Sequence, residues 1–246
     1  MAHAFSRTEL LFGTEGLERL HHARVAVIGI GGVGSFAAEA LARTGIGHLL
    51  LMDGDKVDIT NLNRQIHATH ATIGEWKVEA MKERIHTYAP NCEVETWNCR
   101  YTEETAEQLL AQPLDYIVDA FDTMTFKIHL IKACVERSIP IISSMGAANK
   151  IDPTMLQVAD ISKTSVDPIA RVIRRELRKV GITKGVEVVF STETPMEPHE
   201  SVRAQLVDEG EVETRKQQFP PASNAFVPST AGLTMASVVV RRLLNI

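Results

Sequence analysis

Short apolar blocks alternate along the chain with longer stretches in which apolar residues return at helical spacing. The blocks that we expect to form strands are residues 25–28, 49–52, 92–97, 116–118 and 140–143. The stretches that we expect to form helices between them are residues 75–87, 103–110 and 127–137. Strands that alternate with helices form a parallel sheet with right-handed crossovers. The pattern therefore predicts an α/β fold, with a Rossmann-like, mostly parallel sheet and helices on both faces.

Helical patterns at the two ends extend this central unit. Two short helices are expected before the first strand, separated at Gly13. A last helix is expected at 230–244, where we expect it to pack against the core. The whole chain is expected to form one domain (1–246), made of an N-terminal arm (1–21), a nucleotide-binding half (22–150) and a smaller, substrate-binding C-terminal half (151–246).

Composition excludes several kinds of protein. The net charge of −5 over 246 residues argues against a surface that is basic overall, although a local basic patch is still compatible with it. The three cysteines, Cys92, Cys99 and Cys134, form no C-x-x-C pair, so neither a zinc site nor a disulfide framework is indicated. The chain shows no signal-peptide core, and its apolar end is too short to span a bilayer. We therefore expect a cytoplasmic protein that does not bind membranes.

The strand at 25–28 runs directly into a glycine-rich loop and then into an alanine-rich helix. Gly29, Gly31 and Gly34 have the spacing G-x-G-x-x-G, and Gly32 is an additional glycine inside it. Glycines allow a tight turn and a close approach of phosphate, and the helix N-terminus behind them offers unpaired N–H groups to an anion. Asp53 ends the next strand, about 20 residues after the last glycine. This is the place in the sequence where such a fold has a carboxylate that binds the ribose hydroxyls. The stretch predicts a nucleotide-binding site.

Further polar residues follow the carboxyl ends of the predicted strands, where ligands of parallel sheets bind. They are Asp55, Asn61, Arg64, Lys77 and Asp122. Arg64 and Lys77 can neutralise a triphosphate and stabilise the charge that develops when it is attacked, and Asp122 can hold Mg²⁺. The pyrophosphate of NAD would need fewer cations. The set therefore favours ATP with Mg²⁺, and adenylylation of a carboxylate, over hydride transfer.

The motifs Gly29–Gly34, Asp53-Gly54-Asp55, Asn61–Gln65, Lys77 and Asp119-x-x-Asp122 resemble those of the ubiquitin-activating-like (HesA/MoeB/ThiF) adenylyltransferases. The resemblance implies that Gly32 lies at the ATP phosphates and that Asp53 binds the ribose. It also implies that Asn61, Arg64 and Lys77 hold phosphates and that Asp122 binds Mg²⁺. Arg7 matches an arm arginine that in this family reaches the ATP site of the partner subunit, so a homodimer with Arg7 as a catalytic residue is implied.

A basic helix is the main feature of the second half. It is expected to begin at Asp167-Pro168, and five cations share one face of it: Arg171, Arg174, Arg175, Arg178 and Lys179. Residues 150–184 contain eight Lys or Arg against four Asp or Glu, a net charge of +4, so the rest of the chain carries −9. Such a face is either an ordinary solvated surface or a docking site for a polyanion such as RNA.

Several segments resemble one branch of the family, the tRNA threonylcarbamoyladenosine dehydratases: residues 5–11, 42–47, 63–68, 151–154 and 189–193. The resemblance implies that ATP activates the threonine carboxylate and that the threonylcarbamoyl group on an anticodon-loop adenosine of tRNA closes into a ring. This reaction needs no enzyme cysteine because the nucleophile is tethered in the substrate. Some members of this branch have a cysteine near residues 222–224, which this chain lacks, so a sulfur-relay partner has no support here.

Two other functions are compatible with the nucleotide-binding motifs. The first is activation of the C-terminus of a small ubiquitin-like sulfur carrier, against which the missing C-x-x-C pairs and the lack of cysteine after Cys134 speak. The second is a non-catalytic nucleotide- or NAD-binding module, against which Arg64, Lys77 and Asp122 speak.

Overall fold

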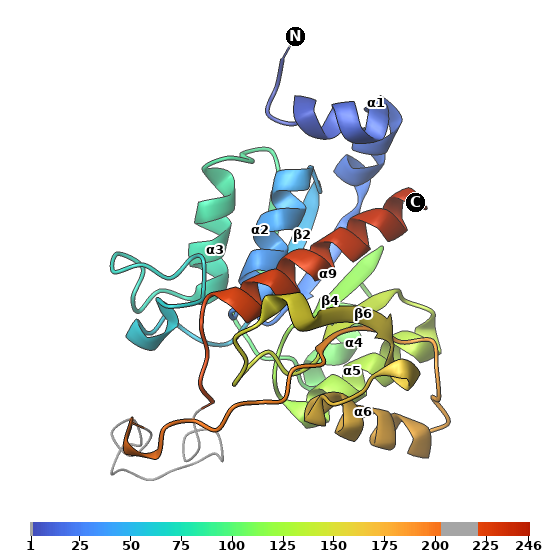
Figure 1. Ribbon diagram of the computed structural model, residues 1–246. Coiled ribbons are helices and arrows are strands. Elements are labelled where there is room, and N and C mark those ends of the chain that lie inside the picture. Colours follow the sequence, from blue (N-terminus) through green and yellow to red (C-terminus); the bar gives the residue numbers. More distant parts are fainter. Residues whose placement is uncertain (1, 203–220) are drawn as a thin grey trace.

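A single seven-stranded sheet forms the centre of the computed structural model, which describes residues 2–202 and 221–246 (Figure 1). The strands are β1 (Arg24–Ile28), β2 (His48–Met52), β3 (Glu93–Trp97), β4 (Tyr116–Asp119), β5 (Ile141–Ser144), β6 (Leu156–Asp160) and β7 (Glu187–Ser191). Their order is β3-β2-β1-β4-β5-β7-β6, and every neighbouring pair is parallel except β6 and β7. The order reverses between β1 and β4, and this is where open α/β sheets form a ligand crevice.

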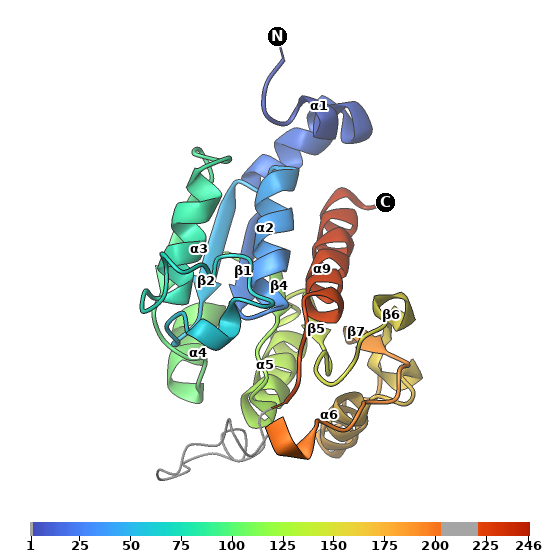
Figure 2. The ribbon, with the colours of Figure 1, turned by 60° about the vertical axis from the view of Figure 1, so that its left-hand side comes forward.

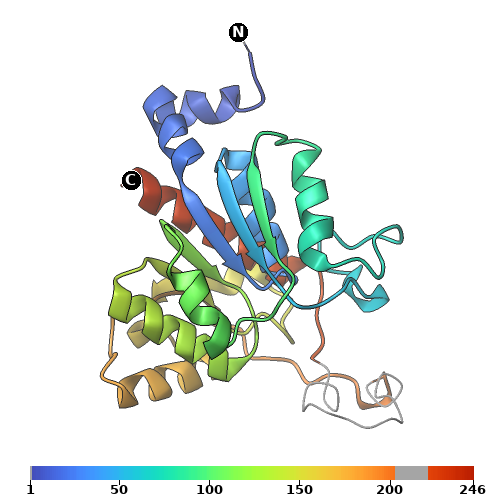
Figure 3. The ribbon, with the colours of Figure 1, turned by 180° about the vertical axis from the view of Figure 1, so that it is seen from behind.

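Helices cover both faces of this sheet, which confirms the predicted fold class. The helices are α1 (Ser6–His22), α2 (Gly34–Thr44), α3 (Lys77–His86), α4 (Glu103–Leu110), α5 (Met124–Arg137), α6 (Pro168–Lys179) and α9 (Phe226–Leu244). Leu41 of α2, Met81 of α3 and Met235 of α9 belong to the core on one face. Leu109 of α4 and Leu130 of α5 belong to the core on the other face. Figure 3 shows the molecule from behind, with this second face towards the reader. Figure 2 shows α9 running alongside α2.

The N-terminal arm lies at the amino ends of the strands, because α1 leads directly into the start of β1 (Figure 1). Gly13 interrupts α1 with a φ of 75°, in the left-handed region, so the helix is kinked and the predicted break between two short helices is confirmed.

The second half of the chain adds two strands, β6 and β7, to the same sheet, and neither was predicted. The strand β6 is short and pairs only with β7, in antiparallel register, so it shows no pattern of a buried parallel strand. No helix among residues 2–202 and 221–246 combines the length and the apolar character that a bilayer crossing requires. The acidic loop around 208–213 lies outside the described residues.

Candidate functional site

The glycine-rich loop connects β1 to α2 at the point where the strand order reverses. Gly29 has a φ of 89°, and a Cβ there would lie 2.7 Å from the backbone nitrogen of Phe121. A Cβ at Gly34 would lie 1.8 Å from the carbonyl oxygen of Gly29, so the turn requires glycine at both positions. A Cβ at Gly31 would lie more than 4 Å from every atom of the described residues other than its two chain neighbours, and no side chain among them caps the N-terminus of α2. An anion can therefore approach the first N–H groups of α2.

Asp53 ties this loop to the end of β2. Its Oδ2 accepts a hydrogen bond of 2.7 Å from the backbone nitrogen of Ile30, and its Oδ1 accepts one of 2.8 Å from that of Asp55. Burial raises the pKa of the Asp53 carboxyl, and the charge of Lys77 opposes that shift. A carboxylate offers about four lone-pair positions, so the two backbone bonds leave room for ribose hydroxyls.

Lys77 begins α3 and is buried at the same edge of the sheet. Its Nζ donates to Asp55 Oδ2 at 3.1 Å, and Arg100 Nη2 donates to the other oxygen, Oδ1, at 2.8 Å. Although burial alone would raise it, the pKa of Asp55 is lowered because the contacts with Arg100 and Lys77 outweigh that effect. Sequence reasoning missed Arg100. Its only signal was its place a few residues after β3, at the carboxyl edge.

Arg64 lies across the glycine-rich loop, close to the start of α9. A Cβ at Gly32 would lie 3.0 Å from Pro228 Cβ and 3.3 Å from Arg64 Cγ, so the absence of a side chain lets these segments meet. Arg64 is half-buried, and the loss of water lowers the pKa of its guanidinium, while the charge of Asp122 opposes the shift. Arg64 and Asp122, from two distant segments, are thus close enough to interact electrostatically at the carboxyl edge of the sheet.

Asn61 ends a short 3₁₀ turn, η1 (Ile59–Asn61), in the loop that leads to Arg64. Its side chain accepts from the backbone nitrogen of Asp58, whose own side chain accepts from Thr60, so the two form a reciprocal cap. Asn61 is buried, and this cap fixes the loop from which Arg64 projects.

A buried ion pair supports the turn that carries Asp122. Lys127 Nζ donates to Asp119 Oδ1 at 2.6 Å, and Ser143 Oγ donates to Asp119 Oδ2 at 2.6 Å. Burial raises the pKa of Asp119, and the pairing with Lys127 opposes that shift. Lys127 Nζ also lies 5.1 Å from the centre of the Phe121 ring. Asp119 therefore has a structural role beneath the site, whereas Asp122 lies at the crevice.

The five cations of α6 (Arg171, Arg174, Arg175, Arg178 and Lys179) differ in the contacts that they make within the protein. Arg174 donates to the carbonyl oxygen and to the hydroxyl of Thr164, so its guanidinium is used inside the protein. Arg175 and Lys179 both pair with Glu176, at 2.9 and 2.6 Å. Arg171 and Arg178 are exposed. Arg174 therefore offers less of its charge to a ligand on this face than helical periodicity alone suggests, because a neighbouring loop accepts its hydrogen bonds.

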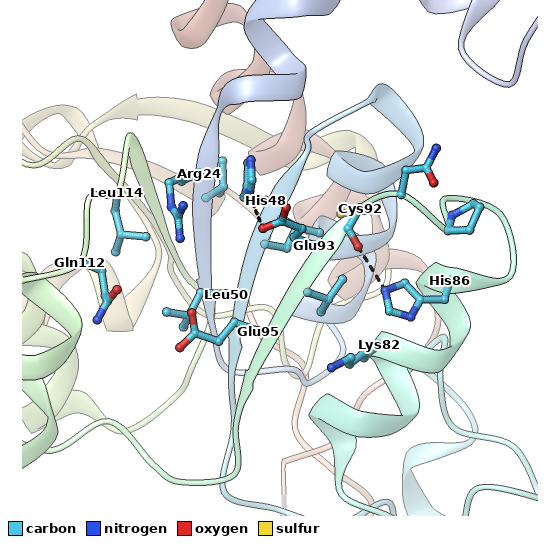
Figure 4. Close-up of a pocket in the computed structure, with 15 residues that line it drawn as sticks. Arg24, His48, Leu50, Lys82, His86, Cys92, Glu93, Glu95, Gln112 and Leu114 are labelled. Atoms are coloured by element: carbon cyan, nitrogen blue, oxygen red, sulfur yellow. Dashed lines mark hydrogen bonds and ion pairs between the residues drawn. The ribbon is translucent and has the colours of Figure 1, made fainter.

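Arg7 is exposed on α1, at the amino edge of the sheet and thus at the opposite edge from the crevice of its own chain (Figure 1). A cavity of about 470 Å³ also lies at that amino edge, beside β3 (Figure 4). Arg24, His48, Lys82 and His86 line it, and none of the predicted nucleotide-binding residues does. This cavity is therefore not the predicted nucleotide site. The place of that site follows from the order of the strands and from the glycine-rich loop.

The buried side chain of His67 is expected to make the stability of the fold depend on pH. It is 2% exposed, and neither ring nitrogen has a hydrogen-bond partner in the described part of the chain. Burial and the charges of Lys77 and Arg84 lower its pKa to about 3. Below pH 6.5 the unfolded chain takes up a proton that the folded chain resists, so the free energy of unfolding should fall as the pH decreases towards 3.

At pH 5 the free energy of unfolding is expected to be about 2 kcal/mol lower than at pH 8. Urea unfolding at pH 5 and pH 8 measures it, and the His67→Phe variant should lose about 2 kcal/mol less than the wild type between these values. Equal losses in the two proteins would show that His67 binds a proton as easily in the folded state as in the unfolded one.

A parallel sheet with a glycine-rich loop at its switch point, faced by two cations and a carboxylate, defines a nucleotide-binding α/β protein. The model of the ThiF family matches residues 5–246, and the chain belongs to this family. It is 59% identical over 245 residues to the tRNA threonylcarbamoyladenosine dehydratase of Bacillus subtilis, covering 100% of this chain and 96% of that protein.

Two further comparisons concern the enzyme of the same name from Escherichia coli. In sequence, the chain is 42% identical to it over 201 residues, which is 79% of this chain and 75% of that protein. Its crystal structure in complex with ATP superposes with a TM-score of 0.87 at 36% identity, over 98% of this chain and 94% of that one. The similarity thus extends over the second half of the chain as well as the first.

Proposed function

We propose that this protein is a tRNA threonylcarbamoyladenosine dehydratase, which uses ATP to close the threonylcarbamoyl group of an anticodon-loop adenosine into a ring. One observation carries the proposal. Arg64, Lys77 and Asp122 converge beside the glycine-rich loop of a chain that is 59% identical, over its full length, to a dehydratase of this name.

The crevice suits ATP with Mg²⁺. The glycine-rich loop and the start of α2 would hold the phosphates, together with Arg64 and Lys77, and Asp53 would bind the ribose. Asp122 would hold Mg²⁺ jointly with phosphate oxygens, since Mg²⁺ at nucleotides needs only one or two protein carboxylates.

The reaction needs charge stabilisation more than a protein nucleophile. When bound, ATP would supply the α-phosphorus: one oxygen of the threonine carboxylate would form a bond to it while the bond to the leaving pyrophosphate breaks. The tethered nucleophile then attacks the carboxyl carbon, loses its proton and expels that oxygen with the phosphate, which completes the loss of water. Arg64 and Lys77 would stabilise the negative charge on the phosphate oxygens. Cys134 is buried in α5, and its thiol pKa is raised to about 12, so it is not an available nucleophile.

A homodimer is part of this proposal. Leu10 and Leu11 of α1 are 81% and 75% exposed, and Arg7 lies on the same helix. Exposed leucines next to an arginine that cannot reach the crevice of its own chain support an arm that packs on a partner subunit. Arg7 would then complete the partner's ATP site. A cytoplasmic location, where tRNA is modified, fits the same function.

We expect the exposed cations of α6 to contact tRNA phosphates. Reversing two of them, Arg171→Glu with Arg178→Glu, should weaken tRNA binding and reduce the slope of log affinity against log salt by about 2. Filter binding between low and moderate salt measures both effects. Arg241→Glu, an exposed reversal at the end of α9, is the matched control. Unchanged affinity and slope in the double variant would remove α6 from the RNA-binding surface.

The function itself is tested by ATP turnover of the purified protein with two tRNA preparations, with and without the threonylcarbamoyl modification. Turnover that requires the modified tRNA, and produces the cyclic nucleoside, is the expected result. Turnover that depends instead on a ubiquitin-like carrier protein, or none with either tRNA, would refute the proposal.

A further inference from the structure

The segment before α9 is tied directly to the loop that carries Arg64, although 160 residues separate them in the sequence. Asn63 Nδ2 donates to the backbone carbonyl of Ser223 at 3.1 Å. Farther along, Pro228 lies where a Cβ of Gly32 would be only 3.0 Å away. The C-terminal part of the chain therefore borders the phosphate-binding loop itself.

The other end of the Asn63 amide holds Arg64. Its Oδ1 accepts from Arg64 Nη1 at 2.8 Å, and the same Nη1 donates to the carbonyl oxygen of Thr60 at 2.8 Å. Both bonds that the guanidinium makes to described residues use Nη1, so Nε and Nη2 are left for the oxygens of a phosphate. An amide is the side chain that can accept from Arg64 and donate to Ser223 at once.

The segment around Ser223 also contacts residues that follow β5, at the carboxyl edge of the sheet. Ala222 and Asn149 exchange two hydrogen bonds of 2.8 Å, and Asn224 Nδ2 donates to the carbonyl oxygen of Lys150 at 2.6 Å. Asn224 Oδ1 accepts from the backbone nitrogen of Phe226, the first residue of α9. Residues 149 and 150 follow β5, next to the strand that precedes Asp122. A shift of Ser223 would therefore reach the substrate side of the crevice.

We propose that Asn63 is a positioning residue that couples the phosphate-binding guanidinium of Arg64 to the substrate-binding half through Ser223. The proposal rests on the function proposed above. A phosphate that binds Arg64 restricts its guanidinium, and Asn63 transmits that restriction to the 221–225 segment. Because coupling is reciprocal, a substrate that orders this segment also orients Arg64 for the nucleotide. Asn63 would act through its contacts with Arg64 and Ser223, without touching the reacting atoms itself.

Hydrogen exchange of the peptide covering residues 221–228 tests the coupling without tRNA. In the wild type, a saturating non-hydrolysable ATP analogue with Mg²⁺ should slow exchange of these amides by at least about fivefold. Asn63→Ala should bind the analogue with a Kd within about tenfold of the wild type, yet slow exchange less than about twofold. Asn63→Asp keeps an acceptor for Arg64 but cannot donate to Ser223, so it should also lose the protection. Asn91→Ala, an exposed amide at the amino edge, should behave as the wild type.

Turnover with modified tRNA supplies a second readout. A residue that only stabilises the fold would lower the melting temperature, whereas loss of coupling should lower kcat by about tenfold and leave the KM for ATP within about threefold. Full protection of residues 221–228 in nucleotide-bound Asn63→Ala would overturn the inference alone. A wild type that does not bind the analogue would overturn the proposed function as well.

Discussion

Replacing Arg64 with alanine should reduce turnover with modified tRNA by about 10²–10³-fold, the cost of removing one fixed charge-stabilising donor from an active site. Arg64 lies against the glycine-rich loop and interacts electrostatically with Asp122, and the hydrogen bonds that it makes to described residues join it to the neighbouring Thr60 and Asn63. Its loss should therefore leave the fold intact. Steady-state kinetics with saturating tRNA, alongside thermal unfolding, measures both quantities.

Arg64→Lys should recover only part of the activity, since lysine keeps the charge but loses the planar fork that binds phosphate oxygens in pairs. Lys132→Ala, which removes a partly exposed cation from α5, is the control for a general loss of positive charge. Turnover of Arg64→Ala within about threefold of the wild type would show that Arg64 does not stabilise the reacting phosphate.

The Lys127→Met variant should lose about 3–5 kcal/mol of folding free energy, because it leaves the Asp119 carboxylate buried without a counter-ion. Both members of the pair are almost fully buried, with 2% and 0% of their side chains exposed. Urea unfolding at pH 7 measures the loss. The turn at Phe121 and Asp122 should be affected too, since Lys127 lies against the Phe121 ring.

The double variant Lys127→Met/Asp119→Leu separates the cost of an unpaired charge from the loss of a useful bond. Replacing a buried ion pair by apolar side chains is often neutral, so the double variant should recover more than half of the lost stability. If it is less stable than Lys127→Met alone, the pair contributes through its hydrogen bonds and not merely by mutual neutralisation.

The strands β1 to β5 and the carboxyl edge with the glycine-rich loop could be predicted from the sequence because their signals are local. The strand β1, the glycines and the start of α2 are contiguous, so their pattern reports the turn directly. Asp53 and Lys77 also lie close to the ends of their own elements, and a parallel sheet brings such ends together.

The features that escaped prediction depend on contacts between distant segments. Asn63 meets Ser223, and Arg174 meets Thr164, only after the second half of the chain has folded onto the first. Arg100 reads as an ordinary surface arginine until Asp55 is placed beside it. The edge strand β6 is half exposed and pairs with one neighbour, so no hydrophobic pattern marks it.

The proposed function requires a triphosphate to bind at the carboxyl edge of the sheet. A crystal structure of the protein with Mg²⁺ and a non-hydrolysable ATP analogue tests this most directly. We predict phosphate density against the glycine-rich loop, within hydrogen-bond reach of Arg64 and Lys77, with the metal beside Asp122. An analogue bound only in the cavity at the amino edge beside β3, or a crevice that stays empty at saturating nucleotide, would contradict the account.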